Sequence, residues 1–126
     1  MIFRYAIIYV ADVRATLDFY RRAFGLEVAM ADESGDYGEL GTGGTKLAFT
    51  SHALMRRLGK EVATTPPERP AYEIAFETDD VAGALARAVA AGAEEVMGVT
   101  QAPWGQTMAY VRTPEGTLVE ICTAVG

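Results

Sequence analysis

The sequence predicts an α+β fold in which two tandem βαβββ modules form a curved, half-open barrel with the helices outside. The chain has 126 residues, half of them hydrophobic, which suits one domain with a substantial core. Its two halves repeat one pattern, in which Tyr5 aligns with Glu73. Each half also ends in a strand introduced by Gly-Thr, at Gly44 and at Gly116. One helix covers only one face of a four-stranded sheet, so two such sheets can curl around a cavity.

The first module is expected to span about residues 1–58. Residues 3–10 are rich in β-branched and aromatic side chains, as strands prefer. Asp12 is a suitable helix N-cap, and Gly25 is a suitable helix end. Between them an apolar stripe with helical spacing is formed by Val13, Leu17, Tyr20 and Phe24. Three strands are expected to follow near 26–31, 36–42 and 45–51.

The second module is expected to span about residues 71–126 and repeats this order. A strand within 71–80 leads to a helix capped by Asp79 or Asp80 and closed by Gly92. Further strands are expected near 94–99, 106–113 and 117–123. The segment 59–70 is polar and rich in proline, so it is interpreted as a linker within a single domain, 1–126.

Two glutamates interrupt the most apolar strands, Glu73 in "YEIAFE" and Glu120 in "TLVEIC". Alternation along a strand places them opposite the helix-facing residues, on the concave face. A ligand or water can satisfy a carboxylate there, whereas an isolated charge in a dry core would cost too much free energy. The same alternation predicts that the concave face also carries Tyr5, Ile7, Tyr9, Lys46, Ala48, Thr50, Ala75, Glu77, Leu118 and Cys122.

These modules, with "DVRATLDFYRRAFGLEV" and the terminal "YVRTPEGTLVEI", resemble the vicinal oxygen chelate superfamily. That superfamily includes glyoxalase I, bleomycin-resistance binding proteins, fosfomycin-resistance enzymes and extradiol dioxygenases. The resemblance spans nearly the whole chain and implies the paired-module fold. It is a weaker guide to function, because one fold serves many chemistries.

In metal-dependent members of the superfamily, one metal ligand comes from each of four strands. The resemblance assigns these positions to Tyr5, Ala48, Glu73 and Glu120. Only the last keeps the usual residue type, while Glu73 replaces a usual histidine. We therefore expect no metal or other cofactor; a divalent ion, if bound, would use Glu73 and Glu120, with His52, the only histidine, as a candidate further ligand.

The loop "APWGQ" is a further candidate, because the resemblance puts it at the cavity mouth. Trp104 could stack on a planar or cationic ligand and Gln106 could offer it an amide, although Trp104 could instead plug the barrel end or form a subunit contact. Glu73 and Glu120 are also candidate catalytic acid and base groups. The aromatic, acidic lining favours a cationic or hydrogen-bond-donating molecule, unless Lys46 and Arg112 pair with the acids. The expected ligand-binding residues are Tyr5, Ile7, Tyr9, Lys46, Ala48, Glu73, Glu77, Trp104, Gln106, Tyr110 and Glu120.

The function expected is capture of a small organic molecule in the concave sheet, as in bleomycin-resistance proteins, by a cytoplasmic homodimer. The net charge of −6 argues against nucleic-acid binding, and no apolar run approaches the length of a membrane span. One alternative is a glyoxalase-like lyase or dioxygenase-like metalloenzyme with an unusual Glu-rich metal site. Another is a structural or regulatory dimer with a vestigial cavity.

Overall fold

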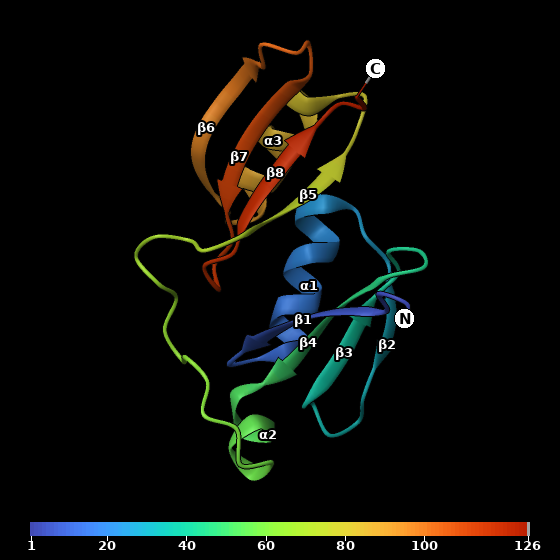
Figure 1. The fold of residues 1–126 in the computed structure, drawn as a ribbon, viewed down its shortest axis with the longest axis vertical. Helices are drawn as coiled ribbons and strands as arrows, with labels where there is room; N and C mark the ends of the chain where they lie inside the picture. Colours follow the sequence, from blue (N-terminus) through green and yellow to red (C-terminus); the bar gives the residue numbers. More distant parts are fainter. Residues whose placement is uncertain (126) are drawn as a thin grey trace. The chain divides into compact units, whose positions relative to one another are not determined.

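The computed structural model describes residues 1–125, which fall into two compact units. The first unit contains Met1–Arg21 and Gly25–Thr65. The second contains Arg22–Phe24 and the chain from Pro66 onward. Each unit is built around one four-stranded sheet (Figure 1).

The first sheet is formed by four strands in the order β1-β4-β3-β2. β1 and β4 are parallel, and the other neighbours are antiparallel. The two helices that accompany these strands are α1 and α2. The bounds are β1 Tyr5–Val10, α1 Val13–Phe24, β2 Val28–Ala31, β3 Tyr37–Leu40, β4 Lys46–Ser51 and α2 His52–Arg57.

Helix α1 begins and ends where its sequence predicts. The Asp12 carboxylate accepts a hydrogen bond from the backbone N–H of Ala15 at 3.0 Å, and Gly25 adopts a left-handed φ of 70° at the other end. Its apolar face packs on the first sheet, where the Tyr20 and Phe49 rings lie 4.9 Å apart. The opposite face of this sheet, which we call the first open face, therefore presents the alternate residues of each strand.

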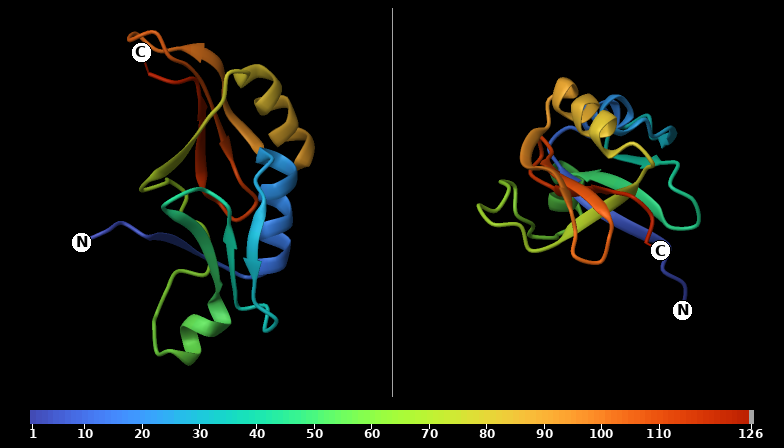
Figure 2. Two further views of the ribbon diagram at one scale, coloured as in Figure 1. Left: turned by 90° about the vertical axis from the view of Figure 1, so that its right-hand side faces the viewer. Right: turned by 90° about the horizontal axis from the view of Figure 1, so that it is seen from above.

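The second sheet repeats this plan, in the order β5-β8-β7-β6 with β5 and β8 parallel. Helix α3 lies along one side of it (Figure 2), and its buried side is formed by Val81, Leu85 and Ala88. The prediction of two βαβββ modules is thus confirmed. The bounds are β5 Glu73–Glu77, α3 Val81–Ala91, β6 Glu94–Gln101, β7 Thr107–Arg112 and β8 Leu118–Cys122.

The stretch after β4 forms a short helix, α2. Ser51 caps it by accepting from the backbone N–H of Leu54 at 3.0 Å. The same hydroxyl donates to Asp36 at 2.6 Å, and Arg57 also binds that carboxylate. These partners hold the pKa of Asp36 below its usual range.

Residues 58–72 then form no helix or strand. None of the helices described within 1–125 is long and apolar enough to cross a membrane.

Candidate functional site

The two glutamates predicted to line the concave face lie on neighbouring strands of the second sheet. Ala75 of β5 is the register partner of Glu120 in β8, so Glu73 stands diagonally across from Glu120. Val119 and Ile121, on either side of Glu120, are almost completely buried on the α3 side. Glu73 is exposed and Glu120 half-buried, so both carboxylates lie on the face away from α3, which we call the second open face.

Tyr110 and Glu120 form a hydrogen-bonded pair beside Glu73. It lies in β7 directly opposite Glu120, and its hydroxyl donates to Oε2 of that carboxylate. The Glu73 carboxyl lies close enough to Glu120 and Tyr110 for both residues to act on its pKa. We call these three residues the Glu–Tyr–Glu group.

The proximity of Glu120 changes the protonation of Glu73. Partial burial and the charge of Glu120 raise the pKa of Glu73, because ionising both acids side by side is unfavourable. The hydrogen bond to Glu120, with partial burial, raises the pKa of the Tyr110 hydroxyl, which therefore remains a donor. Chemically, the group can accept hydrogen bonds from a cationic or N–H-bearing ligand, and it can hold and release one proton.

Cys122 follows on the same strand and is buried. Burial and hydrogen bonding with Glu120 raise the pKa of its thiol to about 11. Since the thiolate is the reactive form, this cysteine is poorly suited to nucleophilic chemistry.

Trp104 lies in the turn between β6 and β7 and is 68% exposed, so within its own unit it is not a buried plug. Its indole N–H donates to Gln106 Oε1 at 2.7 Å. The amide of Gln106 in turn donates to the backbone carbonyl of Thr123 at 2.7 Å. Gln106 therefore positions the indole, and the ring faces remain available for stacking.

Arg112, considered as an ion-pair partner of the acids, instead binds backbone carbonyls. Its guanidinium donates to the carbonyl oxygens of Gly116, Glu68 and Pro67. It lines a pocket of about 390 Å³ between the linker and the turn that joins β7 to β8. None of the predicted ligand-binding residues lines this pocket, so we do not assign the ligand site to it.

The predicted residues of the first unit lie on or beside the first open face. Tyr5, Ile7 and Tyr9 of β1 are 48%, 45% and 40% exposed, which agrees with alternation along the strand. Lys46 is half-buried, but Ala48 is fully covered by its neighbours. His52 is the first residue of α2 and is half-buried.

The first open face also carries a polar pair that the sequence interpretation did not assign. Tyr37 in β3 donates its hydroxyl to Glu39 Oε2 at 2.7 Å. Burial and the neighbouring carboxylate raise the pKa of this hydroxyl. The signal available in the sequence was alternation along 36–42, which places both side chains on one face.

The donor set at the Glu–Tyr–Glu group does not fit the family's divalent metal. Tyr110 donates a hydrogen bond to Glu120, Glu73 lies beside them, and the second unit contains no histidine. Among residues 1–125, no three His, Cys, Asp or Glu side chains are grouped as a metal ion would require.

Comparisons with known proteins agree with this fold. The sequence-family model of the "Glyoxalase/Bleomycin resistance protein/Dioxygenase superfamily" matches residues 2–121. A solved structure of a glyoxalase-related enzyme from Fulvimarina pelagi is 23% identical, with a TM-score of 0.82 over 96% of this chain and 86% of that one. A family enzyme from Burkholderia phytofirmans PsJN is 20% identical, with a TM-score of 0.79 over 98% of both chains.

A protein of unknown function from Agrobacterium tumefaciens str. C58 is 23% identical, with a TM-score of 0.80 over 98% of this chain and 94% of that one. No curated protein sequence matches the chain. At these identities the solved structures establish the fold alone. The family model, in contrast, covers almost the entire sequence, and the chain therefore belongs to the glyoxalase/bleomycin resistance protein/dioxygenase superfamily.

Proposed function

We propose that this protein captures a small organic molecule on the open faces of its sheets, without the metal that many members of its superfamily use. The observation that carries this proposal is the Glu–Tyr–Glu group of the second open face. Its polar atoms converge on one side of a sheet whose other side is packed against α3. A small number of polar groups that converge on one place is typical of ligand sites.

The chemistry of the group favours a ligand with a positive charge or N–H groups. Two carboxylates present acceptor oxygens, while the Tyr110 hydroxyl already donates to one of them. Within the same unit, Trp104 adds an exposed aromatic surface that can stack on a planar or cationic molecule. We further propose that capture is the biological role, and that the protein acts in the cytoplasm as a homodimer.

Binding can be tested by thermal shift and by Trp104 fluorescence against a panel of cationic and neutral aromatic molecules. We expect cationic members to raise the Tm and to change the fluorescence. Glu120→Gln should weaken that binding by about tenfold or more, because it removes a charged acceptor. Tyr72→Phe is a control, since Tyr72 precedes β5 and lies outside both sheets. A panel in which no compound changes the Tm or the fluorescence would contradict capture.

The absence of a metal requirement needs its own experiment. Elemental analysis of protein purified without added metal should give much less than one divalent ion per chain. Stoichiometric metal that is lost in Glu120→Ala would overturn the proposal and favour the lyase or dioxygenase alternative. In that event Glu73 and Glu120 would be its ligands.

A further inference from the structure

Thr50 carries a buried hydroxyl that no group of the described chain satisfies. The residue is 6% exposed, and its Oγ1 finds no hydrogen-bond partner among residues 1–125. A buried polar atom without a partner lowers stability, whereas valine, which has nearly the same shape, would avoid this loss. An atom of this kind therefore suggests a partner that is not part of the chain.

The surroundings of Thr50 are aromatic and acidic. Its register partners are Tyr9 in β1 and Tyr37 in β3, so both side chains flank it on the first open face. Tyr37 in turn donates to Glu39, which lies two residues further along β3 on the same face. Among the described residues, neither Glu39 nor Lys46 belongs to an ion pair. The negative charge of Glu39 is therefore available to a ligand.

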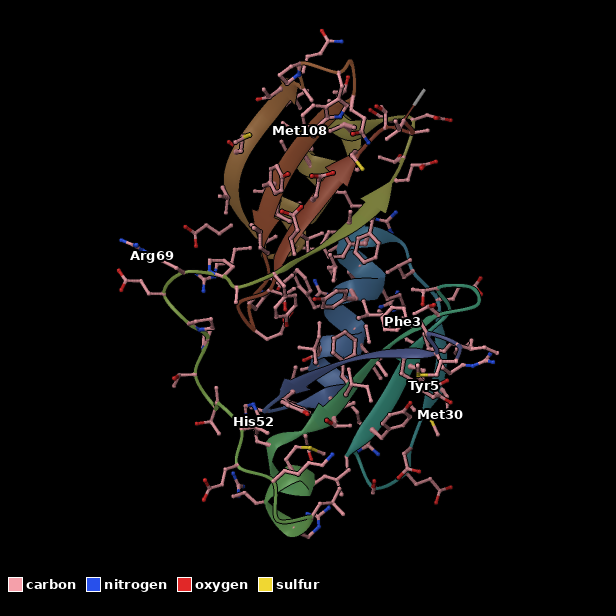
Figure 3. The ribbon with its side chains drawn as sticks, viewed as in Figure 1. Phe3, Tyr5, Met30, His52, Arg69 and Met108 are labelled. Atoms are coloured by element: carbon pink, nitrogen blue, oxygen red, sulfur yellow. The ribbon has the colours of Figure 1, made fainter. Side chains whose placement is uncertain are left out.

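The second sheet shows that the fold itself does not require these polar groups. There the pair equivalent to Tyr37 and Thr50 is Met108 and Cys122, as the matching registers of the two sheets indicate. Figure 3 labels Met108 on β7, and Tyr5 and Met30 on the first sheet. Because an apolar pair fills the same backbone position, the hydroxyls of the first sheet are specific to its face.

We propose that Tyr37, Glu39 and Thr50 form a second polar anchor, which holds the cationic, N–H-bearing end of a small organic ligand. The Glu39 carboxylate supplies the opposite charge, and the Thr50 hydroxyl accepts one N–H of the ligand. The rings of Tyr5 and Tyr9, both about half exposed, provide faces on which a cation can rest. Thr50 is only 6% exposed, so a ligand reaches its hydroxyl when a neighbouring side chain moves aside. This inference rests on the proposed function, since it assumes a small organic ligand.

The test uses benzamidine, a planar cation with N–H donors, and its neutral counterpart benzamide. Backbone amide chemical shifts of the full chain, measured by NMR, report which sheet each probe contacts. We expect millimolar benzamidine, but not benzamide, to shift amides of β1, β3 and β4. Glu39→Gln should weaken this binding by roughly tenfold or more, and Thr50→Val by several-fold, while Thr50→Ser should keep it.

A second readout does not depend on any ligand. Thr50→Val should raise the Tm of the free protein by about 3–6 °C, because it removes an unsatisfied buried hydroxyl. A lower Tm would show that Thr50 Oγ1 is satisfied in the free protein, and would overturn the inference.

The binding outcomes separate this inference from the proposed function. Benzamidine shifts confined to β5, β7 and β8 would support capture by the Glu–Tyr–Glu group and overturn the second anchor. Equal binding of benzamide, or unchanged affinity in Glu39→Gln, would also overturn it. Failure of benzamidine to bind either sheet would overturn the anchor, while the wider panel still decides whether the protein captures neutral or other ligands.

Discussion

Replacement of Arg112 by methionine should release the second half of the linker from the second unit. The guanidinium donates to the backbone carbonyls of Pro67, Glu68 and Gly116. Gly116 also lies against the linker: with a φ of +93°, a Cβ added there would stand 2.1 Å from Pro66 Cβ. Arg112 thus holds residues 67 and 68 by hydrogen bonds, and Gly116 leaves the space that Pro66 occupies.

The magnitude follows from the bonds that are lost. A net contribution of about 0.5–1.5 kcal/mol for each hydrogen bond, reduced because the side chain is half-buried, gives roughly 1.5–3 kcal/mol for the three together. If this free energy resists local opening, its loss should raise the population of the open linker by about 10- to 100-fold.

Limited digestion with a glutamyl endopeptidase measures that opening at one peptide bond. Cleavage after Glu68, whose carbonyl accepts from Arg112, should accelerate by about 10- to 100-fold in Arg112→Met. Cleavage after Glu61, an exposed residue earlier in the linker, is the internal control and should change little. Equal acceleration at both sites would indicate global destabilisation, and no change at Glu68 would refute the role given to Arg112.

Three further perturbations have results that the structure predicts. Gly38→Ala should lower the free energy of unfolding in urea by about 1–3 kcal/mol, because its Cβ would lie 2.5 Å from Leu17 Cδ1; Gly44→Ala, with nothing within 4 Å, should leave it nearly unchanged. Because folding raises the pKa of Glu73, its protonated form stabilises the fold relative to its ionised form. This stability is fully present below the unfolded-state pKa of about 4.3 and is lost as pH rises through the folded-state pKa. Glu73→Gln should therefore stabilise the protein at pH 7 by up to about 1 kcal/mol, an advantage that should vanish below pH 4 in urea titrations. Cys122, with its pKa of about 11, should react with iodoacetamide at pH 8 over about 100-fold more slowly in the native than in the unfolded protein; similar rates would show that the thiol is exposed.

The arrangement of strands and helices could be predicted because local signals and long-range packing agree. Asp12 and Gly25 mark both ends of α1, and the same logic marks α3 with Asp80 and Gly92. Alternation placed Glu73 and Glu120 on one face, since period 2 is a property of the strand itself. The internal repeat then supplied the order of the elements twice, so an error in one module could be checked against the other.

The partners of the polar side chains could not be predicted in the same way. Arg112 could have paired with acids on its own face, but it binds carbonyls of a linker more than forty residues earlier in the chain. Ala48 was expected to line the ligand site, yet larger neighbours cover it completely. Such outcomes depend on rotamers and on where a loop without regular structure lies, and neither is encoded in a short sequence pattern.

The two sheets share a backbone plan but not their polar groups. In the second sheet the tyrosine–glutamate hydrogen bond crosses from β7 to β8, at the pair Tyr110 and Glu120. In the first sheet the corresponding bond runs along β3, from Tyr37 to Glu39. Polar groups needed for folding would be expected at equivalent positions of a repeated module. Since these differ while the strand order is preserved, the shared backbone plan does not by itself account for either pair.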